Sequence, residues 1–162
     1  MMEVCHVAKI LFYASIMCGG AKYTDKSGKD WTIYFPSPKA ALPVLKRDGD
    51  VEWVAWGKRK EEPAECFVNG GWARLDSIKQ GKWKRFHPQP VILPVQSFME
   101  KDHDRKSHWI DVPEGQAIQG LVAHVDDQIR LYVVTMDTPE EYQWVHDRWP
   151  RLVENKTKLE IL

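Results

Sequence analysis

The chain has 162 residues, 43% of them hydrophobic, and its 23 basic side chains are balanced by 23 acidic ones. This length fits one domain with a hydrophobic core, and the zero net charge excludes a uniformly basic surface of the kind that coats nucleic acid. The three cysteines, Cys5, Cys18 and Cys66, stand at wide spacings, which is typical of a reducing compartment and not of a disulfide framework. We therefore expect a cytoplasmic protein, and the scattered His residues give no reason to expect a metal site.

The first sixteen residues form a segment of their own ahead of Met17. Residues 4–18 are mostly apolar, but the run is short and is interrupted by Lys9, so it does not read as a membrane span. No small-residue cleavage site follows it, which disfavours a secretory signal. Two interpretations stay open: the segment packs on the domain as a strand or short helix, or Met17 is the natural start. We divide the chain into an N-terminal extension, 1–16, and a domain, 17–162.

Strands dominate the predicted elements that follow. Residues 24–30 read as a polar turn, and the three prolines within 36–43 predict an irregular connection. Runs rich in β-branched and aromatic residues predict strands at 31–35, 51–56, 91–98, 107–112, 117–125 and 129–136. Asp126-Asp127 lies between the last two runs and is read as a tight hairpin turn.

The strongest helix pattern covers residues 139–149. Thr138 stands at the N-cap, Pro139 at the first helical position and Glu141 three residues after the cap, which together form a capping box. One apolar face then comprises Tyr142, Val145 and Trp149, with His146 near it. Because strands outnumber helices, the predicted class is α+β: a single domain with a mostly antiparallel β-sheet forming an open barrel-like core, and a few short helices.

Several short motifs occur in a fixed order along the chain. They are Met17-Cys18-Gly19, Trp56-Gly57, Ala73-Arg74, VILPVQSFME at 91–100, Gly120-Leu121 and HDRWP at 146–150. In this order and rough spacing they resemble the SOS-response-associated peptidase (SRAP) family, whose chains open with MCGR and continue through WGL, NARxE, P-x-x-GFYEW, AGL and HDRMP. The resemblance extends from Met17 to about Val153, and HDRWP is its most specific single match.

The resemblance implies a function and assigns roles to four residues. Cys18 aligns with the family's reactive cysteine, Glu100 with its catalytic glutamate and His146 with its catalytic histidine. Arg74 aligns with an arginine that contacts DNA phosphate. The implied activity is covalent capture of abasic sites in single-stranded DNA as a DNA–protein crosslink, with self-cleavage of the peptidase type as a way to expose Cys18. The implied setting is the DNA-damage response, with no cofactor, no metal, no membrane and a monomeric protein.

The chemistry of an N-terminal cysteine fits this role. Its amine can attack the aldehyde of a ring-opened abasic sugar to give an imine, and its thiol can then close a thiazolidine ring. Ring opening requires proton transfer, which His146 or Glu100 can provide, and a neighbouring base raises the thiolate fraction of Cys18. The amine must be free, so either translation begins at Met17 and this methionine is then removed, or the bond before Cys18 is cut in the chain that begins at Met1.

The sequence departs from the family pattern at two functional positions. Trp72 stands where the family has a functional asparagine, and Gly20 stands where it has arginine. Asn69, three residues before Trp72, is a candidate substitute for the missing amide. In addition, Asp76 replaces the glutamate of the NARxE element. Trp72 in place of asparagine and the blocked amine of an internal Cys18 favour an alternative, a catalytically impaired relative that binds single-stranded DNA without reacting.

A second signal for nucleic acid lies in the stretch KQGKWKRFH at 79–87. It interleaves the cations Lys82, Lys84 and Arg85 with the ring of Trp83, a pattern that suits phosphates and stacked bases. With Arg74 and Trp72, these residues make up the predicted DNA-binding set. Two further interpretations remain. The basic stretch can be a solvated loop, and Cys18 with His146 can serve an ordinary cysteine hydrolase.

Overall fold

A computed structural model describes residues 19–63 and 66–155. The N-terminal extension, Cys18 and the last seven residues lie outside the described residues. The strands, in chain order, are β1 (Gly20–Thr24), β2 (Asp30–Tyr34), β3 (Ala41–Leu45), β4 (Val51–Ala55), β5 (Trp72–Arg74), β6 (Gln89–Leu93), β7 (Ser97–Lys101), β8 (Ser107–Asp111), β9 (Gln116–Val125), β10 (Gln128–Asp137), β11 (Arg148–Pro150) and β12 (Leu152–Glu154). Three short helices join them: α1 (Leu75–Lys79), η1 (Lys84–Phe86) and η2 (Glu140–Tyr142).

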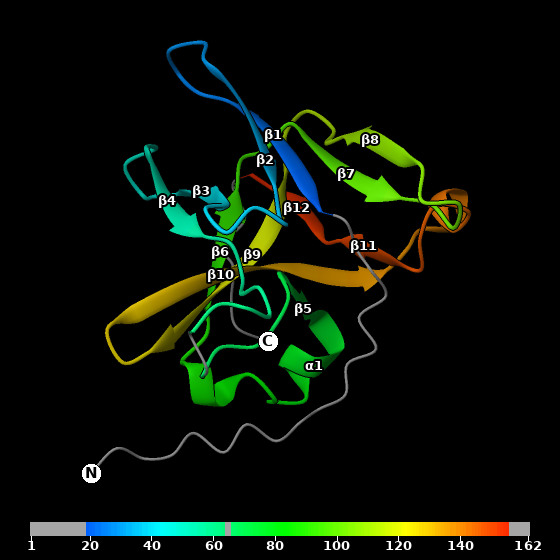
Figure 1. Ribbon diagram of the computed structural model, residues 1–162. Helices are drawn as coiled ribbons and strands as arrows, with labels where there is room; N and C mark the ends of the chain where they lie inside the picture. Colours follow the sequence, from blue (N-terminus) through cyan, green and yellow to red (C-terminus); the bar gives the residue numbers. More distant parts are fainter. Residues whose placement is uncertain (1–18, 64–65, 156–162) are drawn as a thin grey trace.

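The strands form three sheets (Figure 1). A four-stranded antiparallel sheet has the order β2-β1-β7-β8, and β3 pairs with β4 as a separate hairpin. The largest sheet has the order β11-β10-β9-β12, with β5 and β6 joined to β10 and β9. All pairs are antiparallel except β5 with β10. The mostly antiparallel prediction is therefore confirmed, but the described strands do not close into a barrel.

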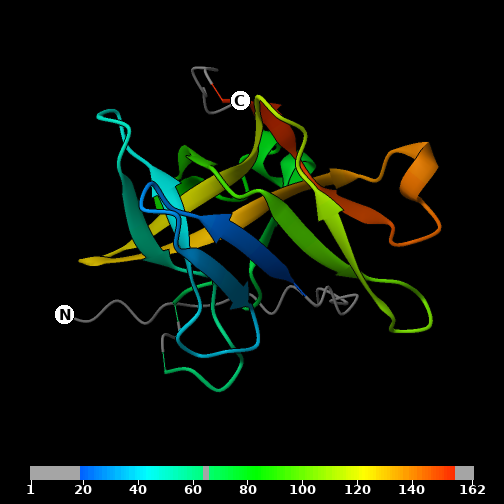
Figure 2. The same cartoon turned by 90° about the horizontal axis from the view of Figure 1, so that it is seen from above.

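The long β9–β10 hairpin is the centre of the fold and runs through the middle of both ribbon views (Figures 1 and 2). Its turn is Asp126-Asp127, as predicted, and Asp126 has a positive φ of 51°. On β10, Leu131, Tyr132 and Val134 are fully buried, because layers of side chains cover both faces of this strand. One core cluster joins the three sheets, and a second lies between the hairpin and the segment containing α1 and η1.

The predicted helix at 139–149 is wrong. Only Glu140–Tyr142 is helical, as a single 3-10 turn, and Arg148–Pro150 is a strand paired with β10. The capping box does not form: Thr138 Oγ1 is buried and caps no backbone N–H group of the described chain. Tyr142 and Trp149 stack with their ring centroids 4.8 Å apart, whereas seven residues of helix would separate them by about 10 Å. Stacking of these rings requires the chain to fold back.

The other local predictions differ mainly in where strands begin and end. The predicted strand at 91–98 is divided into β6 and β7, and the remaining predicted strands agree with the structure within about two residues. Five strands had not been predicted: β1, β3, β5, β11 and β12. The first begins at a glycine and the second contains Pro43, so both lack a clear strand composition.

Gly57 offers a test of how tightly the loop after β4 is packed. Its φ is +57°, and an added Cβ would lie 2.6 Å from Gly71 Cα and closer still to the carbonyl oxygen of Gly70. Gly115 has a similar positive φ of +80° but open space around it. We expect Gly115→Ala to cost about 1–2 kcal/mol for its backbone conformation, and Gly57→Ala to cost about 1–3 kcal/mol more for overpacking. Urea denaturation followed by Trp fluorescence measures both, and equal losses would contradict the tight packing at Gly57.

Candidate functional site

A small cavity lies where the three sheets meet. Its volume is about 20 Å³, enough for one or two water molecules. Glu100 of β7, Trp72 of β5 and Pro150 of β11 contribute to its wall, and so do Gly19 and Gly20 at the start of the described chain. The remaining lining is apolar and comes from Ala21, Leu42, Trp56, Leu93, Val95, Phe98, Met99, Ile118 and Val133. The cavity therefore joins one carboxyl group to the two residues that directly follow Cys18 in the sequence.

Glu100 is a buried carboxyl group that forms no ion pair with any residue of 19–63 and 66–155. Because side chains alternate along β7, Glu100 points inward on the same face as Phe98. It is 2% exposed, and its Oε2 atom has no hydrogen-bond partner. Burial raises the pKa of Glu100 to about 8, because the charged form loses its hydration without gaining a counter-ion. At neutral pH the group therefore holds a proton that it can donate.

The two glycines after Cys18 are closely surrounded by aromatic rings. A Cβ added to Gly19 would lie 2.5 Å from Trp72 Cζ2 and 2.8 Å from Trp56 Cη2, so only glycine fits there. A Cβ added to Gly20 would lie 3.3 Å from Trp109 Cη2 and 3.2 Å from Met99 Cβ. The side chains of Met99 and Trp109 thus occupy the space beside Gly20. Gly20 is the position at which the SRAP pattern has arginine. These contacts fix the path of the backbone as it leaves Cys18.

Trp72 supplies an aromatic wall in place of the family's amide. Its ring lies 4.7 Å from the ring of Phe35 and 5.9 Å from that of Trp56, measured between centroids. Trp56 is held in turn by its indole N–H, which donates to the carbonyl of Gly71 at 3.0 Å. Asn69 does not line the cavity, since its Oδ1 accepts a hydrogen bond from Lys58 Nζ at 2.7 Å in the preceding loop. The structure therefore gives no support to Asn69 as the substitute amide.

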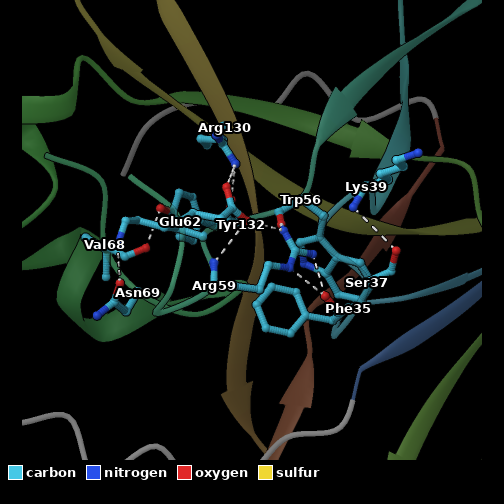
Figure 3. A network of polar contacts seen from close by, with 12 residues as sticks. Phe35, Ser37, Lys39, Trp56, Arg59, Glu62, Val68, Asn69, Arg130 and Tyr132 are labelled. Atoms are coloured by element: carbon cyan, nitrogen blue, oxygen red, sulfur yellow. Dashed lines mark hydrogen bonds and ion pairs between the residues drawn. The ribbon is translucent and has the colours of Figure 1, made fainter. Parts of the chain in front are cut away.

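A buried ion-pair network fixes this aromatic wall (Figure 3). The Arg59 guanidinium donates to the carbonyl of Phe35 at 2.8 Å and to that of Trp56 at 2.7 Å. Glu62 accepts from Arg59 at 3.2 Å and from Arg130 of β10 at 2.8 Å. Tyr132 lies beside the network and donates to Val68 O. The loop after β4 is thus connected to β10 and to the end of β2.

Two arginines lie near each other at one end of the largest sheet. Arg74 ends β5 and pairs with Thr135 of β10, and Arg148 begins β11 and pairs with Asp137, two positions further along β10. Arg74 makes two hydrogen bonds to Asp76, at 3.0 and 3.1 Å, and Arg148 donates to Asp137 at 2.8 Å. The pKa of Arg148 is lowered, first by burial and then by the charge of Arg74. Arg148 Nε is buried without a partner.

His146 lies close to this arginine pair. It is 9% exposed, and its Nδ1 accepts a hydrogen bond from the backbone N–H of Arg148 at 3.1 Å. His146 is not among the residues that line the cavity with Glu100. It follows Val145, which is fully buried, and precedes Trp149, whose ring packs edge-on against Phe98 at 5.0 Å. Of the predicted catalytic residues, the described cavity contains Glu100, while Cys18 lies outside the described residues.

The basic stretch at 79–87 presents cations but no accessible ring. Trp83 is 6% exposed and packs against Tyr132, with 4.9 Å between ring centroids. Lys82, Lys84 and Arg85 are exposed. The interleaved pattern therefore reflects an amphipathic turn whose ring faces the core, and only its charges are available to phosphates.

His108 is a polar residue of this region that the sequence had not singled out. It lies directly opposite Glu100 in the β7–β8 register, and its Nε2 atom is 2.7 Å from Asp102 Oδ2. This contact is the largest cause that lowers the pKa of Asp102. The edge of the His108 ring meets Trp144 at 5.1 Å. The sequence of 107–112 predicted that His108 lies on a strand. It did not predict which strand pairs with it, and therefore not that His108 lies across from Glu100.

Comparison with known proteins gives no family assignment: no protein-family model matches the chain, and no curated protein sequence matches it significantly. Among the described residues, every helix is too short or too polar to cross a bilayer. The same part of the chain contains no group of three or more His, Cys, Asp or Glu side chains that could hold a metal ion.

The raised pKa of Glu100 predicts a dependence of stability on pH. The folded protein keeps this proton up to about pH 8, whereas a glutamate in the unfolded chain loses it near pH 4.3. The contribution of Glu100 to the free energy of unfolding should therefore be fully present below about pH 4.3. It should fall as the pH rises towards 8, by at most about 1.4 kcal/mol per pH unit.

Glu100→Gln should flatten this dependence, because the amide keeps the shape of the carboxylic acid but does not titrate. Urea denaturation at a series of pH values between about 5 and 8.5 measures the effect. The exposed Glu141→Gln is the matched control and should leave the slope unchanged. An unchanged slope in Glu100→Gln would show that Glu100 does not carry the proton.

Proposed function

We propose that the protein is a cytoplasmic SRAP-like domain, with an open barrel-like core, that captures abasic sites in single-stranded DNA through Cys18. The observation that carries the proposal is the buried carboxyl group of Glu100, whose pKa is raised by burial, in a cavity lined by Gly19 and Gly20. A neutral acid beside the residues that follow a terminal cysteine suits a reaction that must expel water from a carbonyl carbon. The order of the motifs around Cys18, Glu100 and His146 supports the same function.

The proposed reaction is a condensation that balances without an oxidant or reductant. The free amine of Cys18 attacks the aldehyde carbon of the ring-opened sugar, and the resulting carbinolamine loses water to give an imine. Glu100 donates a proton to the departing hydroxyl group. The thiol sulfur then adds to the imine carbon, its proton passes to the nitrogen, and a thiazolidine closes. One water molecule leaves in total.

The arginine pair supports a role with a phosphate chain. Arg74 is about half exposed, so its guanidinium can reach a ligand without first leaving a buried site. Arg148 carries a buried Nε–H that lacks a partner, and burial of an unpaired donor is costly unless a ligand satisfies it. Guanidinium groups bind phosphate through paired hydrogen bonds. His146, next to Arg148 in the fold, is then the acid–base residue for ring opening.

A second candidate function rests on Trp72. Its indole lies against the backbone of Gly19, where the resembled family has an amide that can hydrogen-bond. An indole ring has a single hydrogen-bond donor and no acceptor, whereas an amide both donates and accepts. Trp72 therefore cannot reproduce the hydrogen bonds of that amide. The alternative is therefore a non-catalytic relative that binds single-stranded DNA reversibly and forms no covalent product.

The test compares a protein that begins at Met1 with one that begins at Met17. Each is incubated with a single-stranded oligonucleotide that carries one abasic site and is then analysed on a denaturing gel and by intact mass. Once Met17 has been removed, the Met17 form should give a stable adduct whose mass equals the Cys18-initiated protein plus oligonucleotide minus one water. Because only a free amine can form the imine, the Met1 form should react only after cleavage before Cys18.

Three substitutions make the assignment specific. Cys18→Ala should abolish the adduct, Cys66→Ala should leave it unchanged, and Glu100→Gln should slow its formation by about 100-fold or more, as expected for loss of a general acid. An adduct that persists in Cys18→Ala would refute the proposed reaction. Salt-sensitive binding without any denaturation-resistant product would establish the non-catalytic alternative.

A further inference from the structure

The outer face of the four-stranded sheet presents aromatic rings together with a lysine. Side chains alternate across a sheet, so the face opposite Glu100 carries Lys22, Tyr34, Met99 and Trp109. Tyr34 is 48% exposed, so its large ring is in contact with solvent. Large rings that stay in solvent on a small protein are candidates for contact with a ligand.

The rings of Tyr34 and Trp109 form an open corner above Gly20. Their centroids are 6.2 Å apart and their planes meet at 68°, so neither ring covers the other. Lys22 Nζ lies over the Trp109 ring, 4.1 Å from its centroid. Because Trp109 Cη2 and Met99 lie against Gly20, this corner lies only two residues from Cys18 along the chain.

The aromatic surface continues around the free edge of β2. A groove of about 460 Å³ separates β2 from the β3–β4 hairpin, and Tyr34 forms part of its wall. Trp53, which is 38% exposed, lines the same groove together with Lys39, the only charged residue in its lining. Figures 1 and 2 show β2 and this hairpin next to each other. Trp109, Tyr34 and Trp53 thus follow one another from the outer face into the groove.

We propose that Trp109, Tyr34 and Trp53, with Lys22 and Lys39, form a stacking track for the bases that flank the captured nucleotide in single-stranded DNA. The inference rests on the proposed function, because it takes the strand to pass Cys18. Unpaired bases offer flat faces that stack on exposed rings, and lysines placed between those rings meet the phosphates. A base that stacks on Trp109 displaces Lys22 Nζ and leaves its ammonium free for the adjacent phosphate. Asp111 lies two residues from Trp109 on the same face of β8 and across Ser97 from Lys22, so this part of the track carries a carboxylate as well as an ammonium group.

The track would also favour single-stranded DNA over duplex DNA. Stacking needs bases whose faces are open, and in duplex DNA those faces are covered by neighbouring base pairs. The track lies on a face separate from the basic stretch at 79–87, which packs beneath the β9–β10 hairpin. The groove therefore fits an extended single strand, with rings supplying the contact and only two lysines supplying charge.

Binding of an undamaged oligothymidine tests the track apart from the covalent reaction. Fluorescence anisotropy of a labelled oligomer should show reversible, salt-dependent binding to the full chain. Tyr34→Ala should weaken it at least about fivefold, the lower end of the contribution of one stacked base. Tyr34→Phe keeps the ring and should bind as the parent does. Lys22→Gln should reduce the slope of log affinity against log salt by about 0.7.

Ile129→Ala is the positional control. Ile129 is also an exposed large apolar residue, 37% exposed, but it lies at the turn of the β9–β10 hairpin, and its loss should not change binding. Thermal unfolding of each variant verifies that it is folded, and light scattering gives its mass in solution.

Each outcome discriminates between the two proposals. Equal affinity in Tyr34→Ala and the parent overturns the track, and so does the absence of oligothymidine binding by the parent. A dimer that Tyr34→Ala dissociates also overturns it, because a second copy would then cover the rings. Ring-dependent binding without an abasic-site adduct supports the track and refutes the covalent function. An adduct whose yield is insensitive to all track variants supports the covalent function and refutes the track.

Discussion

The arrangement of the three sheets depends on the hydrogen bonds and the ion pair that the buried Arg59 guanidinium makes. It donates to the carbonyl of Phe35 after β2 and to that of Trp56 after β4, and Glu62 connects it to Arg130 on β10. One side chain therefore joins a strand end from each of the smaller sheets to the largest one. Loss of one partner from such a buried network leaves an uncompensated charge, which typically costs about 3–5 kcal/mol.

The chemistry of the cavity follows from this constraint. With Phe35 and Trp56 fixed, Trp72 packs against both rings, and the rings of Trp56 and Trp72 line the side of the cavity next to Gly19. Glu100 is tolerated there because it is neutral, since a neutral carboxyl group is far cheaper to bury than a carboxylate. Burial in this mostly apolar cavity, whose wall includes Trp56 and Trp72, raises the pKa of Glu100.

Local patterns in the sequence predicted the parts of the fold that local physics determines. The β9–β10 hairpin combines β-branched runs with a turn at Asp126-Asp127, so its prediction was accurate. The helix prediction at 139–149 was wrong because tertiary stacking of Tyr142 on Trp149 outweighed the capping signals. Motif order made Glu100 a candidate site residue, but its burial and its position opposite His108 depend on tertiary packing and strand register, which the motifs do not specify. The same holds for Trp83, whose ring faces the core.

Charge pairing sets how this surface can bind a strand. Arg74 is paired with Asp76 and Arg148 with Asp137, so each phosphate contact at these arginines must compete with an existing carboxylate. Counter-ion release gives a large affinity only where many unpaired cations meet phosphates, and the chain as a whole has no excess of positive charge. Rings are not weakened by neighbouring carboxylates in this way, and stacking on them changes little with salt compared with ion pairing. In the proposed function, a protein of this composition would therefore gain most of its affinity for single-stranded DNA from exposed aromatic rings, and the two arginines would orient one phosphate.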